Sequence, residues 1–316
     1  MRGHIVATRQ IDWSIKRLAI DPERACQSIE ELLQHKVQEM RKDGILIGLS
    51  GGLDSAVVAY LSVRAMGREK VNLLNLPDRD SKSIHQEHAA LIAQDLGIQL
   101  RTQEITPVLQ AMKVYELLPI ASMPGKMVRE TVVRMAKSLV DLRRSDDALA
   151  ARFHPKPSSM LAKGNAYAIS KHRVRANLLY YQADLLNLMV VGAANKTELL
   201  TGTFAKWGCD HCADVMPVMH LYRTQIEALA EYLGVPEVVR TKAADPDVLA
   251  GMDNKEALLG SFQEADQILW GLEHGVERAD LVDAFGEATV ARLANLRELS
   301  RSMREVPYVV SGDGLP

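Results

Sequence analysis

The chain has 316 residues, enough for one large domain or two small ones. Its composition, 47% hydrophobic and 25% charged with a formal net charge of −2, is that of a globular protein and gives no indication of a nucleic-acid or membrane-surface partner. Three cysteines are too few for a disulfide framework, no apolar run reaches the roughly 18 residues of a membrane span, and the N-terminus lacks a signal-peptide core, so we expect a cytoplasmic protein.

Strands and helices are predicted to alternate, because short apolar runs of strand length are followed by segments with apolar residues at helical spacing. In chain order we expect a helix over 22–41, a strand over 45–50, a helix over 54–67, a strand over 71–77, a helix over 83–97, a strand over 98–105, a helix over 173–185, a strand over 186–193 and a helix over 223–235. This alternation predicts an α/β fold, with a doubly wound parallel sheet and helices on both faces. Ligands then bind at the carboxyl ends of the strands.

Two segments fall outside the alternation. Residues 107–163 have a mostly helical pattern, and the stretch KMVRETVVRMAKSLVDLRR within them is amphipathic and basic. We expect a packed helical insertion there; a lid, an oligomer contact or a binding arm are the alternatives. Residues 276–316 are expected to form a helical extension up to the tail PYVVSGDGLP. We interpret 1–316 as a single domain with these two additions.

The motif SGGLDS begins at Ser50, the last residue of the first predicted strand, and opens the next helix. Gly51 and Gly52 allow positive φ angles and close approach of a ligand, and their N–H groups with the helix N-terminus form an anion-binding nest. The hydroxyls of Ser50 and Ser55 add donors. Asp54 would repel a phosphate unless a cation lay between them, which predicts Mg²⁺. The alternative, a tight turn with a side-chain cap, is disfavoured by this combination of residues.

SGGLDS resembles the pyrophosphate-binding motif SGGxDS of the ATP pyrophosphatase superfamily, whose members cleave ATP between the α and β phosphates. A loop for γ-phosphate chemistry would read GxxxxGK[ST], which is absent. Further blocks resemble the NAD synthase family within that superfamily. They are LNLPDRDSKSIHQEHAALIAQDLG, KGN, RVRANLLYY, VVGAANKTELLTGTFAKWG and ADVMPVMHLYRTQIEALAEYLGVP. The resemblance covers roughly residues 20–275.

The resemblance implies a Rossmann-like fold of the adenine nucleotide alpha-hydrolase type. It also implies an ammonia-dependent ligase that uses ATP and Mg²⁺ to convert deamido-NAD⁺ to NAD⁺ through an adenylate, with release of AMP and PPi. A homodimer whose interface contributes to the dinucleotide site is implied as well. The site residues are then, for ATP, Ser50, Gly51, Gly52, Leu53, Asp54, Ser55, Arg175, Lys196 and Thr201; for the dinucleotide, Asn165, Arg173, Lys206 and Asp214; for catalysis, Asp54, Lys206 and Asp210; and for the metal, Asp54 and Glu198.

One more segment, AADPDVLAGMDNKEALLG, contains Asp245, Asp253 and Glu256 and resembles a family loop that closes over the dinucleotide. A polar loop with helix-capping acids is the alternative interpretation.

The block GCDHCAD departs from the family pattern. Where the family reads FTKxGDGxxDixP, this chain reads FAKWGCDHCADVMP, which adds one residue and introduces Cys209, His211 and Cys212. We favour thiols with a local structural use; a metal site and a redox or sulfur-transfer role are the alternatives.

Two rival functions stay open. A related ATP pyrophosphatase with the same ATP chemistry would adenylate a different acceptor or transfer sulfur. A non-catalytic nucleotide-binding protein is disfavoured because Asp54 and Glu198 are both present. No glutaminase domain is recognised before the first motif, so we expect ammonia from solution or from a separate glutaminase.

Overall fold

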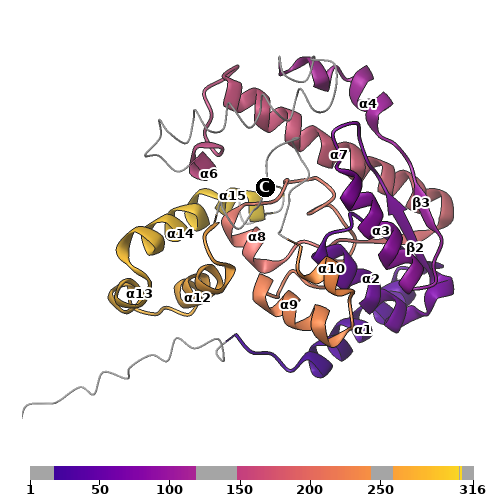
Figure 1. The fold of residues 1–316 in the computed structure, drawn as a ribbon, viewed down its shortest axis with the longest axis horizontal. Coiled ribbons are helices and arrows are strands. Elements are labelled where there is room, and N and C mark those ends of the chain that lie inside the picture. Colours follow the sequence, from indigo (N-terminus) through magenta and orange to yellow (C-terminus); the bar gives the residue numbers. More distant parts are fainter. Residues whose placement is uncertain (1–17, 119–147, 243–258, 306, 308–316) are drawn as a thin grey trace, which may run out of the picture.

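The computed structural model describes residues 18–118, 148–242, 259–305 and 307 (Figure 1). Four parallel strands form one sheet in the order β3-β2-β1-β4. They are β1 (Gly44–Gly48), β2 (Val71–Asn75), β3 (Leu100–Thr102) and β4 (Leu188–Val191). The predicted α/β fold with a parallel sheet is therefore confirmed. Three of these strands lie inside the ranges expected from the sequence, and β1 begins one residue before its expected range of 45–50.

The inner strand β1 is buried on both faces, which is why its sequence, GILIG, is a continuous apolar run rather than an alternating one. In β1, Ile45 and Ile47 pack into one hydrophobic core and Leu46 packs into another. The register pairs Ile47 with Leu73 of β2 on one side and with Val191 of β4 on the other. β1 is thus an inner strand of the sheet, and the motif that follows it emerges between the ends of β2 and β4.

Helices cover both faces of the sheet, as predicted. The core on one face takes side chains from α1 (Pro22–Glu39), α2 (Leu53–Met66), α3 (Ser83–Asp95) and α9 (Arg223–Tyr232). The core on the other face takes them from α4 (Thr106–Ala111), the short 3-10 helix η3 (Val114–Glu116) and α7 (Met160–Leu186). A further 3-10 turn, η2 (Arg68–Lys70), leads from α2 into β2.

A group of helices beside the sheet has a hydrophobic core of its own. This core combines α12 (Phe262–Glu273), α13 (Arg278–Phe285) and α14 (Glu287–Leu299) with the short α6 (Ala148–Ala151). In Figure 1 these C-terminal helices, in yellow, lie across from the strands, with α8 (Lys196–Thr201) and α9 between. Two short helices complete the set, α10 (Glu237–Arg240) and α15 (Arg301–Arg304). The described part of the 276–316 segment is therefore helical, as expected.

The long helix α7 differs most from the sequence expectation, because it begins well before the predicted 173–185. Ser159 supplies its N-cap by accepting a hydrogen bond from the N–H of Ala162. The block KGN thus lies within the helix, since Gly164 does not interrupt it. The helix ends at Asn187, whose φ of 50° is left-handed.

Two expectations fall outside the described residues. These are the basic stretch KMVRETVVRMAKSLVDLRR and the loop with Asp245, Asp253 and Glu256. Within the described ranges, no helix is both long and apolar enough to cross a bilayer.

Candidate active site

A cavity of about 500 Å³ lies at the carboxyl ends of β1 and β4. The SGGLDS loop, the loop after β4, helix α7 and the start of α9 all contribute to its lining. In the sheet, β1 has β2 as its neighbour along one edge and β4 along the other, so the strand order changes direction at β1. Such a change of direction leaves a crevice at the strand ends, and this is where parallel sheets bind ligands.

The SGGLDS loop is closed by its own hydroxyl groups. Ser50 Oγ accepts from the N–H of Gly52 at 3.2 Å, and Ser55 Oγ donates to the Gly52 carbonyl at 3.1 Å. The two hydroxyls lie 3.0 Å apart. Gly52 is the N-cap of α2, and among the described residues no side chain caps this helix. The N–H groups of the first turn of α2 are therefore placed to bind an anion, as the sequence predicts.

The two glycines of the loop have different conformations. Gly51 has the predicted positive φ, at 75°, whereas the prediction is wrong for Gly52, whose φ is −92°. The N-cap position takes an extended backbone, which explains the difference. At Gly51 an added Cβ would lie 2.0 Å from the carbonyl oxygen of His85 in α3, so the tight approach of the loop to α3 requires glycine there.

Asp54 lies in the first turn of α2 and is held by side chains from two distant segments. Arg223 Nη1 donates to its Oδ2 at 2.7 Å, and Asn195 Nδ2 donates to its Oδ1 at 2.8 Å. The Arg223 side chain is only 8% exposed and also pairs with Glu227 at 3.0 Å. Burial by itself would lower the pKa of Arg223, but Asp54 and Glu227 offset this effect and the pKa is raised. Asp54 is therefore a fixed carboxylate on the cavity wall.

Glu198 is linked to Asp54 through Asn195, the N-cap of α8, which contacts both carboxylates. The Asn195 side chain accepts from the N–H of Glu198 at 3.0 Å, and Glu198 Oε2 accepts from the N–H of Asn195 at 3.3 Å. Both carboxylates line the cavity. Two carboxylates next to the N–H groups of a phosphate-type loop are the oxygen donors that Mg²⁺ prefers, so these residues fit the predicted ion.

Two predicted residues on α7 also line the cavity, Asn165 and Arg175. Asn165 Nδ2 donates to the carbonyl of Arg152 at 2.7 Å. Arg175 Nε donates to the carbonyl of Leu76 at 2.9 Å, which ties α7 to the end of β2.

Five predicted side chains are not part of the cavity lining that the structure describes: Arg173, Lys196, Thr201, Lys206 and Asp214. Lys196 pairs with Glu273 of α12 at 2.8 Å, and Lys206 Nζ donates to the carbonyl of Ser302 at 2.6 Å. Arg173 Nη2 donates to the carbonyl of Lys206 at 3.3 Å. The two lysines thus contact the C-terminal helices, which the sequence did not indicate.

The other two of these side chains stabilise secondary structure. Thr201 is fully buried, and its hydroxyl donates to the carbonyl of Thr197 at 2.7 Å inside α8. Asp214 accepts from the N–H of Val190 in β4 at 2.8 Å and from the hydroxyl of Tyr180 at 3.1 Å. These contacts hold elements that border the cavity.

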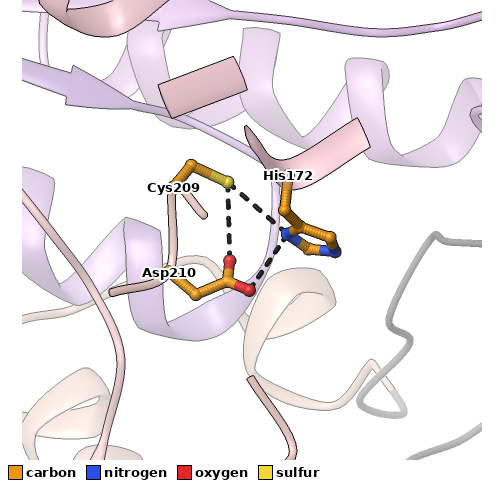
Figure 2. Close-up of side chains that lie close together, drawn as sticks. All are labelled: His172, Cys209 and Asp210. Atoms are coloured by element: carbon orange, nitrogen blue, oxygen red, sulfur yellow. Dashed lines mark hydrogen bonds and ion pairs between the residues drawn. The ribbon is translucent and has the colours of Figure 1, made fainter. Parts of the chain in front are cut away.

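The divergent GCDHCAD block joins the cavity through Cys209 and Asp210, and Figure 2 shows both with His172 of α7. His172 Nδ1 lies 2.9 Å from Asp210 Oδ2 and 3.5 Å from Cys209 Sγ, and Cys209 Sγ lies 3.5 Å from Asp210 Oδ1. Burial, followed by the charge of Asp210, raises the pKa of the Cys209 thiol.

His211 and Cys212 do not join this cluster. His211 stacks on Phe204 with ring centroids 5.0 Å apart and contacts Trp207 edge-on at 5.4 Å. All three cysteines lie in the described residues, and none forms a disulfide. The residues that the sequence grouped as Cys209, His211 and Cys212 are therefore separated, and His172 takes the place of His211.

A buried charged cluster joins α7 to the segment that follows β2, next to the cavity. Lys171 on α7 is fully buried, and its ammonium lies 2.7 Å from Asp78 Oδ2 and 2.8 Å from Asp80 Oδ2. Tyr115 donates to Asp78 at 3.0 Å, and Tyr167 donates to Asp80. Burial opposes the charge of Asp78, but Lys171, together with Arg175 and Ser81, more than offsets it, so the pKa of Asp78 is lowered.

A second buried carboxylate links three helices beside the cavity. Asp266 of α12 accepts from the hydroxyl of Thr197 in α8 at 2.5 Å and from the N–H of Thr224 in α9 at 2.9 Å. Burial raises the pKa of Asp266 to about 6, in spite of these two hydrogen bonds.

Sequence reasoning missed Arg223, Asn195 and His172. Arg223 lies in the family-like block LYRTQIEALAEYLG and His172 directly precedes the predicted helix, so each was within reach of a motif argument. Nothing local marks them as site residues, because their partners are distant in the sequence.

The comparisons with known proteins agree on one family. The family model for NAD synthase matches residues 25–129 and 124–307. A relative from Coprothermobacter proteolyticus, named NH(3)-dependent NAD(+) synthetase, is 35% identical over 286 residues that cover 90% of this chain and 96% of the relative. A protein of the same name from Thermotoga maritima is 37% identical over 279 residues, covering 88% and 96%.

Solved structures agree on the fold. The NH3-dependent NAD synthetase from Campylobacter jejuni, in complex with the nitrate ion, is similar with a TM-score of 0.64 and 25% identity, covering 92% of this chain and all of that one. The NMN synthetase from Francisella tularensis has a TM-score of 0.65 at 24% identity, covering 92% and 99%, and supports the fold alone.

Proposed function

This chain belongs to the NAD synthase family, and from that premise we propose that it forms NAD⁺ from deamido-NAD⁺ and ammonia at the expense of ATP. The observation that carries the proposal is the SGGLDS loop, where the uncapped N-terminus of α2 and the carboxylate of Asp54 line the same cavity. ATP is the substrate such a loop suits, because backbone N–H groups and a helix N-terminus bind phosphate oxygens.

The reaction has two steps. The nicotinate carboxylate attacks the α-phosphorus of ATP, PPi leaves and an adenylate forms. Ammonia then attacks the carboxyl carbon of the adenylate, loses a proton, and AMP leaves with its electron pair. The first step brings several anions together, so the protein's part is orientation and neutralisation of charge. The first-turn N–H groups of α2 are suited to the pyrophosphate, and Arg175, which also lines the cavity, adds a cation.

We propose Mg²⁺ as the ion that accompanies ATP, held by Asp54 and Glu198. When bound, it supplies positive charge between these carboxylates and the phosphate oxygens. Arg223 and Asn195 keep Asp54 in one orientation, so that ordering this side chain costs little when the nucleotide binds.

We also propose a cytoplasmic homodimer that takes ammonia from solution or from a separate glutaminase. Tyr181 and Leu185, one turn apart on α7, are 54% and 63% exposed, which suits burial against a second copy. The three unpaired cysteines suit a reducing compartment. Light scattering during size exclusion tests the dimer, and glutamine in place of ammonium, with and without an added glutaminase, tests the ammonia source.

The experiment that tests the reaction is incubation of the protein with MgATP, an ammonium salt and deamido-NAD⁺, with NAD⁺ and AMP separated by chromatography. We expect equal amounts of both products. If folded protein forms neither, the proposed function is wrong. AMP without NAD⁺ in the presence of another carboxylate would instead identify a different acceptor.

A further inference from the structure

The divergent block, to which the two reaction steps above assign no role, helps to place three potential ligand atoms around one point. His172 Nδ1, Cys209 Sγ and Asp210 lie within hydrogen-bonding range of one another on the cavity wall (Figure 2). Two of them come from the block and one from α7, so tertiary folding brings them together. The backbone N–H of Cys209 donates to the carbonyl of His172 at 3.0 Å, which fixes the two segments against each other.

This arrangement differs from that of a catalytic relay. In a relay the nucleophile and the carboxylate contact opposite nitrogens of the imidazole ring. Here Cys209 Sγ and Asp210 Oδ2 both approach the same nitrogen, Nδ1 of His172. Three heteroatoms that converge on one another, rather than line up in a row, are typical of a ligand set for a cation.

The separations fit a tetrahedral ion of zinc size. With metal–sulfur bonds of about 2.3 Å and metal–nitrogen or metal–oxygen bonds of about 2.0–2.2 Å, tetrahedral ligands lie roughly 3.4–3.6 Å apart. Cys209 Sγ is 3.5 Å from His172 Nδ1 and 3.5 Å from Asp210 Oδ1, which agrees with this range, whereas the nitrogen contacts the other carboxylate oxygen, Oδ2. The nitrogen–oxygen pair, at 2.9 Å, is closer and would separate by about 0.5 Å to accept the ion.

Charge balance favours a divalent cation. When the ion binds, Cys209 loses its proton to solvent, and a thiolate and a carboxylate together match two positive charges. Two cations are already near these ligands, because Arg152 interacts electrostatically with Asp210 and Arg175 with Cys209. A divalent ion bound by fewer than two negative ligands would therefore leave this region strongly positive. The mixture of sulfur, nitrogen and oxygen selects a borderline ion such as Zn²⁺ over Mg²⁺.

We propose that His172, Cys209 and Asp210 form a second cation site, for Zn²⁺ or a similar ion, separate from the Mg²⁺ site at Asp54 and Glu198. Three protein ligands leave a fourth position open, as in catalytic rather than structural zinc sites. Because all three residues line the cavity, this position is within reach of whatever the cavity binds.

The test measures metal binding to the full chain, without ATP and with any affinity tag removed. Protein stripped with a chelator is dialysed against Zn²⁺, and zinc per chain is determined by mass spectrometry. Wild type and C212S, whose thiol lies outside the cluster, are expected to retain one ion per chain. C209S and D210N are expected to bind at least about 100-fold more weakly, because loss of second-shell groups alone costs about 10- to 100-fold.

Co²⁺ provides a spectroscopic readout of the same site. We expect a thiolate-to-cobalt charge-transfer band in wild type and C212S that is missing in C209S. Absence of bound metal in wild type, equal binding by C209S, or displacement of the ion by equimolar Mg²⁺ would each overturn the proposal. The measurement is independent of NAD⁺ formation, so failure of the proposed function and failure of this site are distinguishable.

Discussion

Replacement of Lys171 by methionine gives the most direct test of the buried charged cluster next to the cavity. The ammonium of Lys171 is fully buried between two carboxylates that are 0% and 4% exposed, at 2.7 and 2.8 Å. Methionine keeps most of the side-chain volume but removes the charge, so Asp78 and Asp80 lose their nearest cation. Arg175 and Arg79 lie farther away, at 3.9 and 3.8 Å from these carboxylates.

We expect K171M to lower the free energy of unfolding by about 3–5 kcal/mol at pH 7, the range for breaking a buried ion pair by removing one partner. The presence of two carboxylates places the expectation toward the upper end of that range. The whole stability of a domain is only about 5–15 kcal/mol, so this single change removes a large share of it.

K36M is the matched control. Lys36 on α1 has an ion pair of similar length, 2.6 Å to Glu39, but the two side chains are 36% and 52% exposed. Loss of such a surface pair costs about 0–1 kcal/mol. Urea unfolding followed by circular dichroism gives both values on the same protein. If K171M costs no more than K36M, the reasoning that burial makes the Lys171 pairs strong is refuted.

The pH dependence adds a second check on K171M. In the wild type the lowered pKa of Asp78 contributes stability that is present above about pH 4 and is lost as the pH falls through the lowered value. In K171M this contribution is missing, because burial then opposes the charged form. The difference in the free energy of unfolding between wild type and K171M is therefore expected to be largest at neutral pH and to become smaller in acid.

Three further substitutions test the cavity and its surroundings. G51A places a Cβ 2.0 Å from the His85 carbonyl oxygen and is expected to lower the free energy of unfolding by about 2–5 kcal/mol. The control G234A has a similar φ of 72° but open space around the added Cβ, so it should cost only about 1–2 kcal/mol. Equal urea midpoints for the two variants would contradict the clash at Gly51. D54N keeps the side-chain shape but removes the charge, so AMP formation should fall at least about 10²-fold while circular dichroism stays unchanged; retained activity would show that this carboxylate does not hold the metal. Asp266 has a folded pKa of about 6 against 3.8, so its protonated form stabilises the fold below about pH 4 and this contribution is lost as the pH rises through about 6. Relative to D266N, the free energy of unfolding of wild type, measured by urea titration, should fall by about 3 kcal/mol over that pH interval. A difference between the two proteins that does not change with pH would contradict the raised pKa.

The sequence was sufficient for the sheet because each strand has a local signal. GILIG and LMVV are short apolar runs bounded by polar or glycine residues, and both are buried strands. The start of α7 was missed because Gly164 and Asn165 have low helix propensity and resemble a helix break, whereas the helix begins at the Ser159 cap and continues through them.

The candidate site was predictable only where the residues follow one another in the chain. The SGGLDS loop carries its function in six consecutive residues, so the turn, the open helix end and the carboxylate were all expected. Lys196 and Lys206 also lie in family-like blocks, yet their contacts with Glu273 and Ser302 depend on where the C-terminal helices pack. Arg223 was missed for the same reason, since its pairing with Asp54 is a tertiary contact.

The position of β1 between β2 and β4 has a consequence for how the protein acquires its cavity. Asp54 is separated by 141 residues from Asn195 and by 169 residues from Arg223, the two side chains that orient it. Contacts of such high sequence separation form slowly, because a long loop must close before they contribute. During synthesis, the phosphate loop therefore leaves the ribosome long before the segments that complete its site, and nucleotide binding arises only when most of the chain has been made.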